Sequence, residues 1–282
     1  MLAIKHVSNI RLINRQLKNV INCAKISTNS YYSNTLIKHN PTRTYNDNLK
    51  NSFKNGNSLI YGDETLLTEA CKHGNIKIIN KLLRSGVDVN EPNKNGIRPL
   101  AMACKHSNTI SSLETVNLLL NCDVSDDSVH EALLTSSYYS GSFSCVDTVE
   151  LLISSKFINI DVNCTNNIGS SPLMLACTAN FDTVNLLLEY YADVNQENIY
   201  GYTPLMMACI HNYKEDSLNI VKLLLESGAD VNVADKWGYT PFMMAHDNAT
   251  TKDTHDIVEL LIKAGADIYA KNNKGTTAFN LA

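Results

Sequence analysis

The 282-residue sequence lacks any apolar run near the roughly 18 to 20 residues that a membrane-spanning helix requires. Basic residues interrupt residues 1–25 every few positions, unlike the apolar centre of a secretory signal. The eight Cys are spread along the chain without the density of a small disulfide-linked scaffold, which favours reduced thiols. The sequence therefore predicts a soluble intracellular protein.

The sequence also lacks the short motifs of common catalytic chemistry. It contains no Gly-x-x-x-x-Gly-Lys phosphate loop, no Gly-x-Ser-x-Gly elbow, no His-Glu-x-x-His pair and no kinase catalytic loop. The acid pairs Glu215 with Asp216 and Asp253 with Asp256 lie in polar stretches, where a solvated loop is a commoner explanation than acid–base catalysis. We therefore predict no enzyme activity, no cofactor and no metal site.

Acidic residues are nearly missing from the first 60 residues, which hold nine Lys or Arg against the single acid Asp47. The rest of the chain holds 15 basic and 27 acidic residues. A protein that coats DNA or RNA is expected to carry positive charge across its folded part, and here that part is acidic. We therefore expect no nucleic-acid partner.

One pattern recurs along the chain from about residue 61. Its clearest copies are Gly201–Cys209 followed by Ile220–Asn232, and Gly238–Ala245 followed by Ile257–Ile268. Periods of 20 to 50 residues indicate a repeat architecture. Equivalent positions, separated by 33, 34, 39, 32, 37 and 37 residues, are Leu66, Pro99, Leu133, Pro172, Pro204, Pro241 and Ala278.

Each part of the pattern has a local physical reason. Thr203 suits a helix N-cap, and Pro204 suits the first helical position, where no backbone donor is needed. Leu223–Leu225 supplies the apolar stripe of a second helix, and Gly228 follows it where a left-handed residue ends a helix. Such a helix pair cannot bury its own core, so the units are expected to stack into a solenoid. The same roles recur at Thr240, Pro241, Gly86 and Gly265.

These residues resemble the ankyrin repeat family. The resemblance implies an all-α solenoid over residues 61–282, with six repeats and part of a seventh, each a helix–turn–helix followed by an extended hairpin turn. It also implies a non-catalytic module that binds a protein partner through the concave face formed by the turn tips and the first helices. The third unit, around Ala132–Tyr138, lacks the Thr-Pro start and the glycine turns, so we expect it to be the weakest.

The family's usual His after Pro-Leu is missing, which leaves open what holds the turns together. The residues in its place are Thr68, Ala101, Met174, Met206 and Met243.

Aromatic residues collect at the turns of the fifth and sixth units. Trp and Tyr are the residues most enriched at binding hot spots, so we predict a partner-binding strip there, with Asn198 as a further polar rim residue. The alternative is that these side chains only pack on the adjacent turn. Ile97 and Ile168 would extend the strip more weakly. The predicted site residues are Ile199, Tyr200, Tyr202, Lys236, Trp237 and Tyr239.

Four Cys occupy one repeat position, and three of them belong to Cys-x-His pairs. Side chains two apart on a helix point to opposite sides, and stacked units lie about 8 to 10 Å apart, too far for convergence on one zinc or for a disulfide. We therefore expect small buried side chains. The four are Cys71, Cys104, Cys177 and Cys209.

Residues 1–60 form a basic extension, in which apolar residues of the first 25 share one helical face opposite basic residues. We expect an amphipathic helix and then a mostly disordered linker. The helix has three possible roles: a mitochondrial transit peptide, a cap on the first unit, or a basic tail.

Cytoplasmic localisation is expected, with mitochondria as the alternative. The alternative functions are an adaptor that delivers a bound protein to degradation or signalling machinery, and an imported organelle protein. At the other end, Phe279 and Leu281 are expected to be partly exposed.

Overall fold

The computed structural model describes residues 60–61, 64–107, 113–139, 146–155, 160–178, 180–211, 216–247 and 252–280. All of them lie within residues 56–282, one of the two units into which the chain divides. The expected N-terminal helix and almost all of the expected linker fall outside the described residues. The division at residue 60 therefore stays a prediction.

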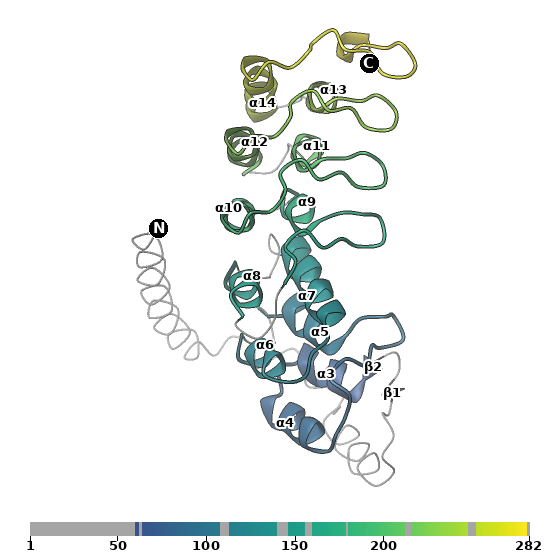
Figure 1. Ribbon diagram of the computed structural model, residues 1–282, viewed down its shortest axis with the longest axis vertical. Helices are drawn as coiled ribbons and strands as arrows, with labels where there is room; N and C mark the ends of the chain where they lie inside the picture. Colours follow the sequence, from purple (N-terminus) through teal and green to yellow (C-terminus); the bar gives the residue numbers. More distant parts are fainter. Residues whose placement is uncertain are drawn as a thin grey trace, which may run out of the picture. The chain divides into compact units, whose positions relative to one another are not determined.

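The described residues form six helix pairs stacked one on the next (Figure 1). First helices pack on first helices in one column, and from α6 onward second helices pack on second helices in another. The predicted all-α solenoid is confirmed. The first helices are α3 (Leu66–Lys72), α5 (Pro99–Lys105), α7 (Asp126–Tyr139), α9 (Pro172–Ala176), α11 (Pro204–Ile210) and α13 (Pro241–Asp247). The second helices are α4 (Ile76–Arg84), α6 (Leu113–Leu120), α8 (Val146–Ile153), α10 (Phe181–Glu189), α12 (Ser217–Glu226) and α14 (Lys252–Lys263).

Two short elements flank the helix pairs. Strands β1 (Ile60–Tyr61) and β2 (Glu64–Thr65) pair antiparallel before α3, with Ile60 opposite Thr65. After α14, a single 3-10 turn, η1 (Ala278–Asn280), takes the place of a seventh first helix.

The first helices begin as the sequence predicts. The Thr203 hydroxyl accepts a hydrogen bond from Met206 N at 3.3 Å, and the Thr240 hydroxyl accepts one from Met243 N at 3.3 Å. Each cap satisfies a backbone donor that the helix leaves unpaired, and Pro follows where no donor is needed. One leucine or phenylalanine of each first helix is buried, with at most 1% exposed, and these side chains form the core column: Leu67, Leu100, Leu133, Leu173, Leu205 and Phe242.

A ladder of asparagines joins successive units. The Asn195 side chain accepts a hydrogen bond from Asp230 N at 2.8 Å and donates one to Gly228 O at 3.1 Å, both in the next unit. Asn232 makes the same two bonds to Asp267 N and Gly265 O. Each asparagine amide binds one backbone N–H group and one backbone carbonyl of the next unit, so the ladder fixes the stacking register of the units.

The third unit begins differently from the sequence-based expectation. Ser125 caps α7, with its hydroxyl accepting from Ser128 N at 3.3 Å, and Asp126 and Asp127 lie in the first turn, where acids favour a helix start. The unit lacks the Thr-Pro start, as noted in the sequence, and begins instead at Ser125, farther from Leu133 than the starts of the other units lie from their equivalent positions. The expectation that it is the weakest unit stays a prediction.

Two polar stretches also differ from expectation. The sequence predicts exposed polar loops around residues 213–217 and 250–254, but Ser217 belongs to α12, Thr254 belongs to α14, and both are buried. Residues 213–215 and 250–251 of these stretches lie outside the described residues.

Four of the six second helices, α4, α10, α12 and α14, are followed closely by a residue with positive φ. Gly86, Gly228 and Gly265 have φ of 82°, 91° and 92°, which confirms the predicted glycine turns. Tyr191 ends α10 at the same place with φ of 64°, the one positive value of a non-glycine residue in the described part of the chain. Its side chain is 89% exposed, so burial does not offset the strain of this conformation.

We predict that Tyr191→Gly raises the free energy of unfolding by about 1 kcal/mol, because glycine adopts this φ without strain. Gly228→Ala is the matched control. An added Cβ there meets no atom within 4 Å, so only backbone strain acts and a loss of about 1 kcal/mol is expected. Equilibrium urea unfolding of both variants checks the two signs, and a destabilised Tyr191→Gly contradicts the assignment of strain.

Candidate partner-binding surface

The extended turns between units, here called fingers, comprise residues 93–97, 166–170, 198–202, 235–239 and 272–276. Each begins with Asn or Asp, whose side-chain oxygen accepts hydrogen bonds from backbone N–H groups two and four residues on, at 2.8 to 3.1 Å. This side chain closes each turn without the family's usual His. The signal was present in the sequence as Asn or Asp three residues before a finger glycine, and sequence reasoning missed it.

Asn198 was predicted to lie on the rim of the binding strip, and that prediction was wrong. Its side chain is only 8% exposed, because its oxygen accepts from Tyr200 N at 2.9 Å and Tyr202 N at 3.0 Å. Its nitrogen donates to the Ser170 hydroxyl at 3.4 Å. Asn198 therefore shapes its finger and is not available to a partner.

Four successive fingers are linked by backbone hydrogen bonds. Ile199 N donates to Ile168 O at 3.0 Å, and Lys236 N donates to Tyr200 O at 3.0 Å. Asn273 N donates to Trp237 O at 2.9 Å. The fingers from 166–170 to 272–276 consequently form one continuous row that projects from the helices (Figure 1). Side chains at their tips are thus held at fixed spacing.

Three predicted site residues form a ring cluster on this row. The Tyr200 and Trp237 rings are stacked, with centroids 6.0 Å apart and planes 20° apart. The Tyr202 ring is tilted against both, with centroids 6.2 Å away. Burial raises the pKa of the Tyr202 phenol, with further contributions from the nearby Asp235 and Tyr200. Although the rings pack on one another across adjacent fingers, Tyr200 is still 38% and Trp237 49% exposed.

The other predicted site residues lie beside this cluster. Ile199 and Lys236 are exposed at the tips, whereas Tyr239 is half-buried at the base of its finger. There Tyr239 N donates to the Asp235 carboxylate at 2.8 Å. Ile168 is exposed on the preceding finger of the same row.

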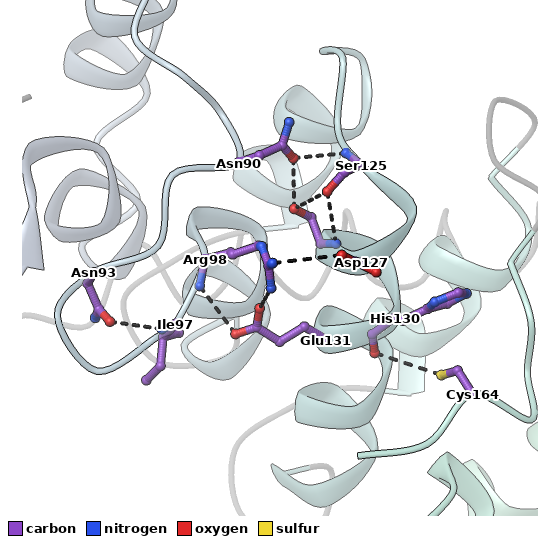
Figure 2. Close-up of polar contacts among 10 residues, drawn as sticks. Asn90, Asn93, Ile97, Arg98, Ser125, Asp127, His130, Glu131 and Cys164 are labelled. Carbon is purple, nitrogen blue, oxygen red and sulfur yellow. Dashed lines mark hydrogen bonds and ion pairs between the residues drawn. The ribbon is translucent and has the colours of Figure 1, made fainter. Parts of the chain in front are cut away.

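The row does not extend to the second unit. Only residues 121–125 separate α6 from α7, too few for a finger, and the first turns of α7 occupy that place. Glu131 of α7 accepts from Arg98 N at 3.2 Å and from the Arg98 guanidinium at 2.8 Å, and Asp127 lies 4.0 Å from the same guanidinium (Figure 2). Half-buried Ile97 therefore stands on a finger apart from the row.

Asn90 completes the join between the second and third units. Its side-chain oxygen accepts from Ser125 N at 2.8 Å (Figure 2). The same oxygen accepts from the Ser128 hydroxyl at 2.7 Å. The asparagine ladder thus continues through the unit that has no finger.

The four Cys at one repeat position are buried, as predicted, with at most 3% of each exposed. Burial raises the pKa of all four thiols, that of Cys209 to about 12, so they stay protonated at neutral pH. No group of three or more His, Cys, Asp or Glu in the described part of the chain is placed to hold a metal ion. The described helices include none that is long and apolar enough to cross a bilayer.

We predict that iodoacetamide modifies Cys122 at least ~10-fold faster than Cys104 in the native protein, because only the thiolate reacts and Cys104 is fully enclosed. Burial raises the pKa of Cys122 as well, but its side chain is partly exposed. Peptide mapping by mass spectrometry measures both rates. Equal native rates would contradict the burial of Cys104, and both thiols should react at similar rates in urea.

A family model for ankyrin repeats, built from three copies, matches the chain at residues 34–129, 67–163, 139–235 and 214–282. The chain belongs to the ankyrin repeat family. Ankyrin repeats are generally protein–protein interaction modules and generally non-catalytic. None of the curated proteins compared with this ankyrin repeat protein matches it.

Proposed function

We propose that this ankyrin repeat protein binds a protein partner through the aromatic strip of its fifth and sixth units. The strip consists of Ile199, Tyr200, Tyr202, Lys236, Trp237 and Tyr239. The observation that carries the proposal is the Tyr200, Tyr202 and Trp237 cluster, which keeps two aromatic rings partly exposed on a row of linked fingers. Rigid aromatic side chains lose little conformational freedom on binding, so they are efficient anchors at interfaces.

The test compares partner capture by the wild-type protein and by a Trp237→Ala, Tyr239→Ala double variant, read by quantitative mass spectrometry. We expect prey that binds the wild type to be lost at least ~10-fold from the double variant, as for hot-spot truncations. Tyr269→Ala is the control, because Tyr269 is 73% exposed but lies outside the fingers. Circular dichroism and urea unfolding establish that the variants fold. Prey retained by a folded double variant would remove the strip from the binding surface.

The adaptor and organelle-import alternatives depend on residues 1–60. Those residues lie almost entirely outside the described part of the chain, so these functions and the cytoplasmic or mitochondrial localisation remain predictions. Sequencing the N-terminus of the mature protein separates them, since import would remove the first 25 residues and an adaptor would keep them.

A further inference from the structure

One finger of the row carries a charge that its turn does not need. Four of the five fingers in the described residues open with asparagine, and the finger 235–239 opens with Asp235. Asp235 accepts from Trp237 N and Tyr239 N at 2.9 and 2.8 Å, and Asn198 accepts the equivalent bonds at 2.9 and 3.0 Å. A neutral amide therefore closes the turn as well as the carboxylate does.

Asp235 is only 7% exposed, so little water screens its charge from neighbouring groups. It lies in the finger that carries Trp237 and close to the Tyr202 ring, whose pKa it helps to raise. The negative charge therefore sits beside the aromatic cluster. The faces of aromatic rings are themselves regions of negative potential, so the carboxylate and the rings attract the same kind of ligand, a cation.

We propose that the aromatic strip binds an arginine side chain of the protein partner, with the guanidinium lying flat on an open face of the Trp237 or Tyr200 ring and attracted by the Asp235 carboxylate. The inference rests on the proposed function and names the chemistry that this surface recognises. A planar guanidinium stacks on a ring better than the compact ammonium of lysine does.

The ring geometry limits where the guanidinium can lie. A guanidinium between two rings needs about 7 Å between them, twice the usual contact distance of about 3.5 Å. The Tyr200 and Trp237 centroids are only 6.0 Å apart, so the ligand must use an outer face. Trp237 is 49% exposed, and such a ligand would cover this exposed surface.

The charge around the strip favours the same ligand. Residues 108–282 hold 22 acidic and 8 basic residues, and no arginine. A basic segment of a partner is therefore attracted to this part of the chain, and opposite charges speed association and select against acidic competitors. An apolar or proline-rich segment would gain nothing from Asp235.

The test uses the fluorescence of Trp237, the single tryptophan of the chain, which reports this site alone. The probes are blocked peptides with four Gly-Arg repeats, four Gly-Lys repeats and four Gly-citrulline repeats, titrated into the full-length protein at low salt. Citrulline keeps the shape of arginine and removes its charge. We expect a saturable change in Trp237 emission with the arginine peptide, weaker binding of the lysine peptide, and none of the citrulline peptide.

Two variants separate the local charge from the net charge. Asp235→Asn should weaken binding of the arginine peptide by up to about fivefold, the size of one exposed ion pair, because the attraction of the carboxylate is lost while the ring contact stays. The double variant Asp235→Asn, Asn95→Asp has the wild-type net charge, but its new acid lies exposed on the finger apart from the row, so we expect the same loss. Urea unfolding should show that both variants are folded, because asparagine closes the same turn as Asp235 and the Asn95 side chain is exposed.

Three results would overturn the inference: equal binding of the arginine and citrulline peptides, recovery of wild-type affinity in the double variant, or no response of Trp237 to the arginine peptide. None of them bears on the proposed function, which depends on capture by the Trp237→Ala, Tyr239→Ala variant. Loss of partner in that experiment together with unchanged binding of the arginine peptide by Asp235→Asn would keep the strip and overturn the role of Asp235 in the inference.

Discussion

Gly238→Ala is expected to lower the free energy of unfolding by about 3 kcal/mol or more. Gly238 has φ of 82°, which strains any residue with a Cβ. An added Cβ would also lie 2.8 Å from Asn273 N and 2.9 Å from the Asn272 Cα, both backbone atoms of the next finger. Because backbone cannot move aside as a flexible side chain can, the two fingers must separate, which stretches the hydrogen bond from Asn273 N to Trp237 O.

Gly275→Ala is the matched control for this prediction. Gly275 has φ of 77° in the equivalent position of the last finger, but an added Cβ there meets no atom within 4 Å. Only backbone strain acts, so we expect a loss of about 1 kcal/mol. Urea unfolding of both variants measures the difference. Equal losses would show that the fingers are not in close contact, and the rigid row on which the aromatic strip depends would then be wrong.

The elements that the sequence predicted well depend on signals within one unit. Thr203 and Pro204 mark a helix start, and Gly228 marks the end of a second helix, whichever unit packs beside them. Repetition of these signals makes the family recognisable, and the family supplies the solenoid.

The features that sequence reasoning missed depend on contacts between units. Glu131 binds Arg98, 33 residues earlier, because the first turns of α7 replace a finger. The asparagine ladder likewise joins residues 33 to 35 positions apart. Such pairs follow from the register of the stack, which is set only after the units pack. The start of the third unit at Ser125 was likewise not predicted, because it lies outside the usual spacing of the repeat.

In the candidate site, some features were predictable from the sequence and others were not. The aromatic residues of the fingers were visible in the sequence, but whether they pack on the adjacent finger or face a partner was left open. Both occur, because the finger spacing brings Tyr200 and Trp237 into ring contact while leaving part of each exposed. Asn198 was misplaced because its polarity suggested solvent, whereas its side chain satisfies backbone donors of its own finger.

Phe242→Ala is expected to cost about 3 to 5 kcal/mol, the usual range for a buried phenylalanine. Phe242 is 1% exposed in α13, and its ring lies 6.0 Å from that of His246 and 6.3 Å from that of Phe279. Removal of the ring leaves a cavity between α13, its neighbour α11 and η1. If these elements keep their positions, the atoms that line the cavity lose their van der Waals contacts with the ring. Urea unfolding measures the loss.

Phe279→Ala isolates the contribution of burial. Phe279 occupies the equivalent repeat position in η1, and its removal deletes the same ring contact with Phe242, but its side chain is 53% exposed. We therefore expect a loss of about 1 kcal/mol or less, because most of the ring already contacts water. If Phe279→Ala costs as much as Phe242→Ala, then another surface covers the Phe279 ring in solution. Sedimentation across a concentration series would then show whether that surface belongs to a second copy of the chain.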